Sequence, residues 1–123
     1  MIMTVYTHVP LPGLVPVSLA RPVHDSRGDE LGTLDDVFLD LDHNRIAYAT
    51  LHVNGSEEPV AVPWPELRRD RDGDFHLNVD LDTLRAAPRP NGASSDDPAE
   101  SDLWLRELYL YYGHVPYRGR TMR

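Results

Sequence analysis

The sequence predicts a mainly β protein, in which a small antiparallel β-barrel is followed by one C-terminal α-helix. Three observations support this fold class. Apolar and polar residues alternate along several short runs, turn-forming residues separate those runs, and no segment between them is long enough for a crossover helix. The 123 residues are enough for one ordinary domain with one hydrophobic core.

The first part of the chain is expected to be extended. Residues 1–16 include Pro10, Pro12 and Pro16, which would interrupt a helix, so we interpret this segment as an N-terminal arm. The barrel is expected over residues 17–90. Its strands show the period of two that is typical of half-buried strands, and the clearest examples are residues 36–41, 47–53 and 75–79.

Turn signals separate these strands. Gly, Asn and Asp, which favour tight turns, cluster at residues 26–29, 42–44, 54–55 and 70–74. Each of these turns joins strands that are neighbours in the sequence, which predicts antiparallel pairing. Closure of the sheet into a barrel would also protect the edges of such short strands.

The character of the chain changes after the last strand. Residues 81–87 can form a short helical turn that Pro88 ends, and residues 91–99 are rich in Pro, Gly, Ser and Asp, as in a solvated linker. An aromatic helix is expected over residues 100–113, with Ser101 or Asp102 capping its start and Gly113 ending it. Residues 114–123 then form an irregular tail.

Charge and composition exclude several classes of protein. The formal net charge is -8, so the chain lacks the basic surface that nucleic acids and anionic membranes attract. No apolar run is long enough to span a membrane, and the first residues do not read as a signal peptide. The chain has no Cys, which suits a reducing compartment, and we expect a cytoplasmic protein.

The sequence offers no convincing metal or catalytic centre. Asp70, Asp72 and Asp74 resemble part of a calcium loop, but the glycine and glutamate that such a loop needs are missing. We therefore favour a hairpin turn there, and whether this turn binds a cation stays open. The six His residues lack the local spacings of metal sites, and no Ser lies in a nucleophile elbow. We expect no catalytic residue, no metal site and no cofactor.

The predicted C-terminal helix carries more apolar surface than one side of a barrel can cover. Two stripes occur at helical spacing, the first formed by Trp104, Leu108 and Tyr111 and the second by Leu105, Tyr109 and Tyr112. We expect one stripe to pack on the barrel and the other on a second chain, most simply in a homodimer. The alternative is a helix that lies in a groove of its own barrel with its tyrosine hydroxyls in solvent. The predicted interface consists of Trp104, Leu105, Leu108, Tyr109, Tyr111, Tyr112 and Tyr117.

Residues 19–88 resemble a PRC-barrel domain, the module known from the H subunit of photosynthetic reaction centres and from the C-terminal half of the ribosome maturation factor. The resemblance depends on the order and spacing of short segments: Pro22-Val23, Gly28, the run from Leu31 to Asp40, Arg45 to Ala49, Val60 to Trp64, and Leu81 to Pro88. It implies an interaction or assembly module without a shared catalytic set.

Five residues are expected to be structural: Gly28, Gly32, Asp40, Pro63 and Trp64. Gly32 falls inside a strand, where a missing side chain permits a bulge or a close backbone approach. Pro63 ends a strand because proline has no N–H to donate, and the indole of Trp64 is large enough to plug the mouth of the barrel.

The function that the sequence favours is a non-enzymatic module that binds an unidentified protein partner and self-associates through its C-terminal helix. One alternative is a small-ligand or metal-binding protein, possibly an enzyme, with a pocket near Trp64 and His52. A second alternative is a ribosome or RNA assembly accessory, by analogy with the family, and the negative net charge disfavours it.

Overall fold

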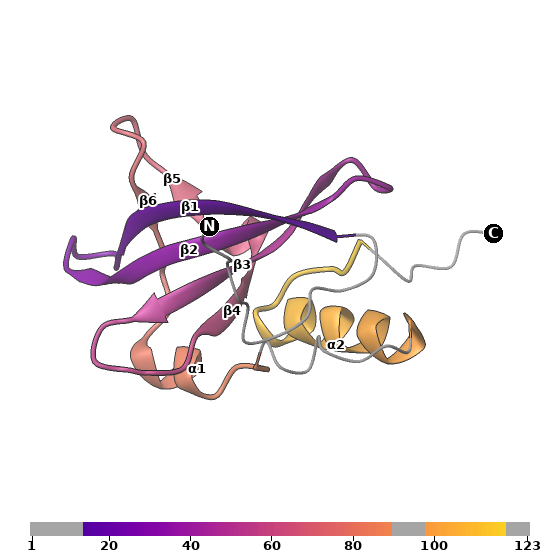
Figure 1. Cartoon of the computed structure of the whole chain (residues 1–123). Helices are drawn as coiled ribbons and strands as arrows, with labels where there is room; N and C mark the ends of the chain where they lie inside the picture. The colour runs from indigo at the N-terminus through magenta and orange to yellow at the C-terminus, as the bar shows by residue number, and fades with distance from the viewer. Residues whose placement is uncertain (1–13, 90–97, 118–123) are drawn as a thin grey trace, which may run out of the picture.

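The computed structural model describes residues 14–89 and 98–117, and its order of elements is shown in Figure 1. The helices are the single-turn 3₁₀ helix η1 and the α-helices α1 and α2. The elements are β1 (Leu14–His24), β2 (Glu30–Asp40), β3 (Arg45–Val53), β4 (Val60–Pro63), η1 (Trp64–Glu66), β5 (Arg68–Arg69), β6 (Phe75–His76), α1 (Leu81–Arg85) and α2 (Pro98–Tyr111).

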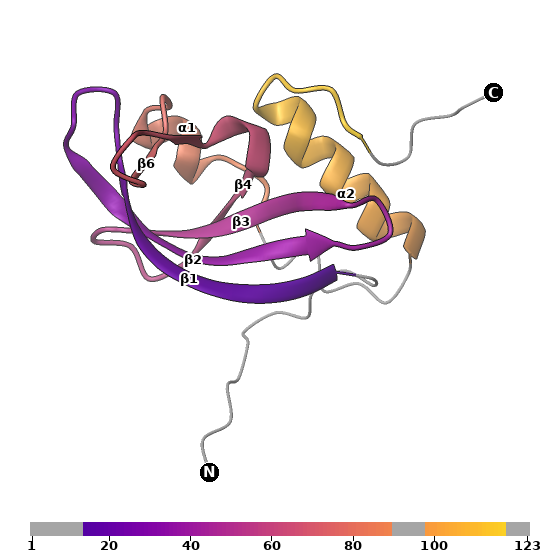
Figure 2. The same cartoon turned by 90° about the horizontal axis from the view of Figure 1, so that it is seen from above.

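The strands form one mixed sheet in the order β4-β3-β2-β1-β6-β5. Consecutive strands from β1 to β4 pair antiparallel, as the turn signals predict. The prediction of a wholly antiparallel sheet is wrong at one place, because β6 pairs with β1 in parallel, at Val23–Phe75 and His24–His76. After β4 the chain passes around the end of the sheet and reaches β1 from its other side. The result is a curled half-barrel, visible in Figure 2.

Gly32 is placed where two backbones come unusually close. It pairs with Val53 of β3, and a Cβ atom built on it would lie 2.0 Å from the carbonyl oxygen of His52. The register of β1 against β2 shifts directly beside this position, and the register of β2 against β3 shifts between Leu34 and Asp36. Only glycine fits here without moving β3, which gives a physical reason for a glycine at this position.

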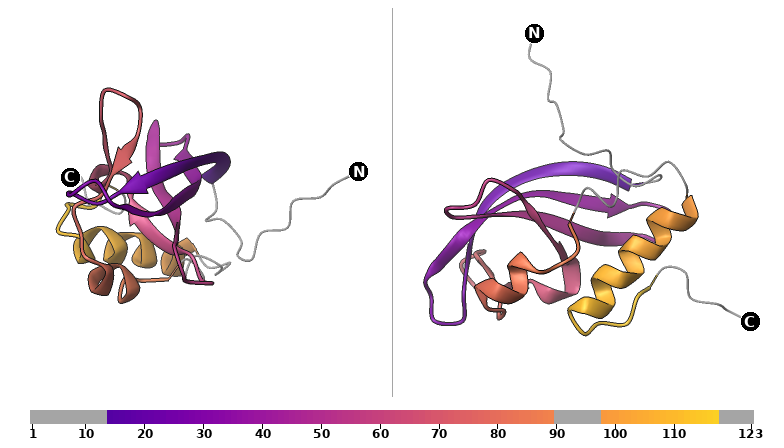
Figure 3. Two further views of the ribbon diagram at one scale, coloured as in Figure 1. Left: turned by 90° about the vertical axis from the view of Figure 1, so that its left-hand side faces the viewer. Right: turned by 90° about the horizontal axis from the view of Figure 1, so that it is seen from below.

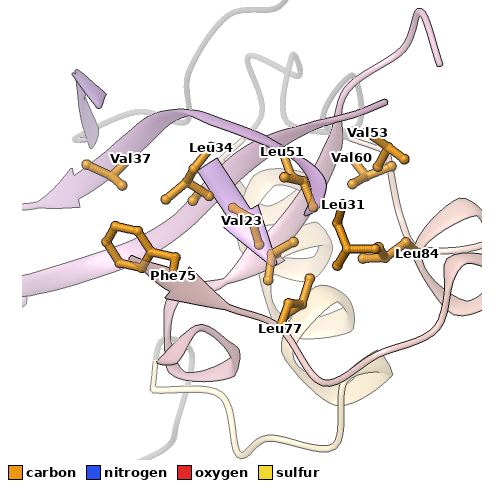
Figure 4. Close-up of a cluster of buried hydrophobic side chains, with 12 residues drawn as sticks. Val23, Leu31, Leu34, Val37, Leu51, Val53, Val60, Phe75, Leu77 and Leu84 are labelled. Atoms are coloured by element: carbon orange, nitrogen blue, oxygen red, sulfur yellow. The ribbon is translucent and has the colours of Figure 1, made fainter. Parts of the chain in front are cut away.

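A first hydrophobic cluster fills the concave side of the half-barrel (Figure 4). It gathers buried side chains from β1, β2, β3, β4, β6 and α1, among them Val23, Leu34, Leu51 and Leu84. Trp64 lies partly buried at the margin of this cluster, with its ring 5.8 Å from that of Phe75. This position is directly after β4, which ends at Pro63. That Trp64 plugs one end of the barrel stays a prediction.

Two turns of the same design connect β1 to β2 and β5 to β6. In each, an aspartate side chain accepts hydrogen bonds from the backbone N–H groups two and four residues later. Asp25 binds Arg27 and Asp29 in this way, and Asp70 binds Asp72 and Asp74. Gly28 has φ of 92°, a conformation that costs a side-chain-bearing residue energy, so its predicted structural role has a backbone reason.

Several predicted boundaries shift. β1 begins at Leu14, so residues 14–16 belong to a strand, while the rest of the predicted arm, residues 1–13, lies outside the described residues. The strand predicted at residues 75–79 is reduced to Phe75–His76, because the backbone turns away after Leu77 donates to the carbonyl of His24. The predicted tail is described only to residue 117.

The C-terminal helix starts earlier than expected. α2 begins at Pro98, inside the predicted linker, whose remaining residues up to 97 lie outside the described part of the chain. Proline is well suited to the first turn of a helix, where its missing N–H is not needed. Ser101 and Asp102 therefore lie within the helix and do not cap it. Gly113 ends it as predicted, with its N–H bonded to the carbonyl of Leu110.

Candidate interaction surface

Helix α2 runs beside β3 and β4 and covers a second hydrophobic cluster (Figures 2 and 3). Alternate residues of β2 point into different clusters: Val37 into the first and Phe38 into the second. The same holds for Val62 and Ala61 of β4. Both faces of this part of the sheet are therefore buried, one by the first cluster and the other by the cluster under α2. Residues that alternation alone would place in solvent, such as Phe38, Tyr48 and Thr50, are at most 3% exposed.

Four of the residues predicted at an interface between chains are buried within their own chain. Trp104, Leu105, Leu108 and Tyr109 belong to the second cluster, and each is at most 7% exposed. These four residues come from both predicted stripes, which lie next to each other around the helix, so each stripe contributes two residues to the contact with the sheet. These four residues cannot be contacts with a second chain, because the sheet already covers them.

The polar tips of the aromatic side chains also bind the same chain. The hydroxyl of Tyr109 donates to the carbonyl oxygen of Ala47 at 2.5 Å, and that of Tyr112 donates to Ala61 at 3.2 Å. The indole N–H of Trp104 donates to the carbonyl oxygen of Arg89 at 2.8 Å, and the hydroxyl of Tyr111 donates to the carbonyl oxygen of Thr83 at 2.6 Å. Side chains of α2 are therefore fixed to β3, α1 and the segment after α1, and Tyr112, directly after α2, is fixed to β4.

The segment after α2 folds back onto the sheet. The hydroxyl of Tyr117 donates to Oδ2 of Asp40 at 2.8 Å, and the guanidinium of Arg45 lies 4.5 Å from the centre of the Tyr117 ring. Asp40 is 1% exposed and also accepts a bond from the backbone N–H of His43 at 3.2 Å. Asp40 is thus an anchor for the C-terminal segment, which gives its predicted structural role a physical basis.

A second contact fastens this segment to the other end of the half-barrel. Nε2 of His114 lies 2.6 Å from Oε1 of Glu66 in η1, and both side chains are partly buried. Neither contact has a local signal in the sequence, because Tyr117 and Asp40 are 77 residues apart and His114 and Glu66 are 48 apart. Only the folded chain brings each pair together.

Tyr48 occupies the centre of the second cluster. Its ring stacks on Phe38, with centres 4.5 Å apart, and meets Trp104 edge-on at 5.1 Å. Its hydroxyl has no hydrogen-bond partner in the described part of the chain. Burial, and then the nearby charge of Asp36, raises the pKa of this hydroxyl, so Tyr48 stays neutral.

The outward side of α2 remains accessible. Leu103 is 51% exposed and Leu110 is 59% exposed, and the charged residues Arg106 and Glu107 lie between them in the sequence. Of the residues predicted at an interface, Tyr111 has the most open side chain, at 38%. We call Leu103, Arg106, Glu107 and Leu110 the outer face of α2. None of the predicted interface residues lies on this face, although the order of its apolar and charged residues is visible in the sequence.

The alternative pocket near Trp64 and His52 is not supported by the geometry. Trp64 packs against the first cluster, whereas His52 lies between Leu51 and Val53, which point into that cluster, so its side chain leaves from the opposite side of β3. Burial raises the pKa of the Asp35 carboxyl, and the charge of the nearby His52 imidazole lowers it by a smaller amount. An open, polar pocket does occur elsewhere, between residues 25–27 and residues 77–80.

The carboxylate of Asp70, in the segment that resembles a calcium loop, binds groups of its own hairpin. Oδ1 of Asp70 accepts two backbone N–H groups, and Oδ2 lies 2.8 Å from Nε2 of His76. The hydrogen bond from His76 and the backbone bonds hold the pKa of Asp70 below its ordinary value, and Asp70 in turn raises the pKa of His76. In residues 14–89 and 98–117, no three His, Asp or Glu side chains are grouped to hold a metal ion.

The comparison with known proteins agrees with this architecture. The family model of the PRC-barrel domain matches residues 19–84, more than half of the chain. No curated protein matches the chain. The matched region includes all the strands after the start of β1 and ends within α1, so that α2 lies outside it. Of the helices that the structure describes, none has the length and apolar character needed to cross a membrane.

Proposed function

The chain belongs to the PRC-barrel domain family, and from this premise we propose that it is a non-enzymatic interaction or assembly module that self-associates through α2. The simplest assembly is a homodimer. The family is generally non-enzymatic, and its domain is used for interaction and assembly. The proposal assigns the matched barrel the role of a rigid support and assigns α2 the role of the contact surface.

The observation that carries the proposal is the division of α2 into two sides. One side is held to the sheet by buried aromatic side chains and by their hydrogen bonds. The other side exposes Leu103 and Leu110 on a helix that is already ordered. A preformed surface loses little conformational entropy when a partner binds, which favours its use for association.

The charge of the protein narrows the class of partner. A net charge of -8 opposes the approach of phosphate-rich partners, so we propose a protein partner and no nucleic acid or membrane. The absence of Cys from the sequence supports a cytoplasmic location.

Sedimentation equilibrium of the full chain over a wide concentration range tests the proposal. We expect the mass to rise from monomer to dimer, and we expect Leu103→Glu combined with Leu110→Glu to remain monomeric. Both leucines are exposed, so the variant should keep the circular dichroism spectrum and unfolding midpoint of the parent chain.

Leu41→Glu is the matched control. Leu41 is 66% exposed in the turn between β2 and β3, so this variant places a glutamate at an exposed leucine outside α2. We expect this variant to dimerise like the parent chain. A parent chain that is monomeric at millimolar concentration would refute self-association, and equal weakening by Leu41→Glu would refute the assignment to α2.

A further inference from the structure

The imidazole of His43 contacts a carboxylate in a way that differs from the other histidine pairs. Within residues 14–89 and 98–117, His76 and His114 each meet their carboxylate through Nε2. His43 uses its other ring nitrogen, and Nδ1 lies 3.0 Å from Oδ2 of Asp40. In the same part of the chain, Nε2 of His43 has no hydrogen-bond partner. The contact therefore leaves this nitrogen available.

Asp40 fixes the tautomer of the His43 ring. Its Oδ2 also accepts a bond from the hydroxyl of Tyr117 at 2.8 Å, and its Oδ1 accepts the backbone N–H of His43 at 3.2 Å. These donors favour the ionised form of the buried carboxylate. Because an ionised carboxylate only accepts hydrogen bonds, the proton between Asp40 and His43 belongs to Nδ1. Nε2 of the neutral ring then carries a lone pair.

The ring is open on the side of Nε2. The side chain of His43 is 43% exposed, whereas that of Asp40 is 2% exposed. Nδ1 faces the buried carboxylate, so the exposed part of the ring is the part that includes Nε2. A carboxylate that accepts the Nδ1 proton raises the basicity of the other nitrogen. An exposed, oriented imidazole of this kind is suited to act as a nucleophile.

A guanidinium lies near the same ring. The guanidinium of Arg45 is 4.5 Å from the centre of the Tyr117 ring, and the His43 ring is 5.5 Å from that centre. Among the residues that the structure describes, Arg45 forms no ion pair. The fork of N–H groups on a guanidinium matches the oxygens of a phosphoryl group. The neighbouring arginine therefore favours a phosphoryl group over an uncharged acyl group as the electrophile.

We propose that His43 is a modification site, at which Nε2 accepts a phosphoryl group from a small acyl phosphate. The lone pair of Nε2 attacks phosphorus and forms the N–P bond. The bond between phosphorus and the acyl oxygen breaks, and its electron pair leaves with the carboxylate product. The proton on Nδ1 stays on the ring, bonded to Asp40, and Arg45 binds the phosphoryl oxygens. Asp40 is a positioning residue in this step.

Incubation of the full chain with acetyl phosphate, followed by mapping of the label by mass spectrometry, tests the proposal. His52 is the internal control, because its side chain is also exposed and accepts or donates no hydrogen bond within the described residues. We expect His43 to be labelled about tenfold faster than His52, given the effect of an orienting carboxylate on an imidazole. Equal labelling of the two histidines, or no label on His43, would overturn the proposal.

Long-range proton–nitrogen NMR tests the tautomer directly. In the parent chain we expect the proton of the neutral His43 ring on Nδ1, and a proton on Nε2 would overturn the proposal. Asp40→Asn should shift the proton toward Nε2 and slow the labelling of His43 about tenfold. Tyr117→Phe is the matched control, because it removes a bond to the same carboxylate and keeps the contact with His43. Equal slowing in the two variants would contradict the positioning role of Asp40.

The charges beside His43 give a further test. Arg45→Gln should slow labelling at low acetyl phosphate concentration, because the donor loses a cationic partner. Asp42 is an exposed carboxylate next to His43, so Asp42→Asn should have the opposite effect. A rate that is unchanged in Arg45→Gln would refute the contact of Arg45 with the phosphoryl group. None of these measurements depends on the oligomeric state, so they succeed or fail independently of self-association.

Discussion

The hydroxyl of Tyr109 donates a hydrogen bond to the carbonyl oxygen of Ala47, which lies 62 residues earlier in the chain. Tyr109 is 2% exposed, so the bond is shielded from water. It joins the last turn of α2 to the start of β3. This contact explains why a helix outside the region matched by the PRC-barrel model is nevertheless part of the core.

Tyr109→Phe should lower the free energy of unfolding by about 1 to 2 kcal/mol, because the buried carbonyl of Ala47 loses its side-chain donor. Urea unfolding followed by tryptophan fluorescence measures the change. Tyr111→Phe is the control, since its hydroxyl binds the carbonyl of Thr83 in an exposed setting, where water can replace it. Equal losses in the two variants would contradict the role given to burial.

Tyr48→Phe should have the opposite result. Its hydroxyl is buried without a partner in the described part of the chain, so its removal ends a desolvation cost and leaves the ring stacking in place. We expect the free energy of unfolding to stay the same or to rise by up to about 1 kcal/mol. A loss comparable to that of Tyr109→Phe would show that the hydroxyl has a partner.

Much of the barrel was predictable because its signals are local. The alternation in β2 and β3, the glycines of the turns and Pro63 at the end of β4 each act within a few residues. The parallel contact between β1 and β6 was not predictable in this way. It joins Val23 to Phe75 across most of the barrel sequence, and the alternation at residues 75–79 does not show which strand these residues pair with or in which direction.

Gly32→Ala should destabilise the sheet more than a glycine substitution in a turn. The new methyl group would collide with the carbonyl of His52, and β3 would have to move, at a cost of about 3 kcal/mol. Gly55→Ala is the control. Its Cβ would meet no atom within 4 Å, so it carries only the conformational cost of positive φ, about 1 kcal/mol. Thermal unfolding of both variants compares the two costs, and equal shifts would contradict the steric explanation.

The ion pair between His76 and Asp70 should depend on pH in both directions. Asp70 raises the pKa of His76, so the contribution of His76 is complete below the ordinary histidine value of 6.5 and is lost as pH rises through the raised pKa. The pKa of Asp70 is lowered, so its contribution is complete above its ordinary value of 3.8 and is lost as pH falls through the lowered pKa. The pair therefore acts fully between these values.

An NMR titration of the His76 ring checks this pair. Asp70→Asn should lower the midpoint of His76, because the amide cannot supply the negative charge. Asp72→Asn is the matched control, since Asp72 contributes only its backbone N–H to the turn, and it should leave the midpoint nearly in place. An unchanged midpoint in Asp70→Asn would refute the coupling.

The candidate surface shows where reading from sequence reached its limit. The excess of apolar residues in α2 was visible, but the sequence did not show which of them the sheet would cover. Trp104 and Tyr109 were expected at an interface and lie in the core instead. Alternation suggested that Phe38 and Tyr48 belong to a solvent-facing side of the sheet. The second cluster, in which these residues pack against α2, was therefore not predicted.

The two tyrosines that hold α2 to β3 and β4 bind main-chain carbonyls of Ala47 and Ala61. Every amino acid carries such a carbonyl, so these attachment points survive replacement of the strand residues as long as the backbone keeps its path. The barrel can therefore accumulate substitutions over evolutionary time without releasing its helix. Loss of either tyrosine hydroxyl, in contrast, removes one of these two hydrogen bonds directly.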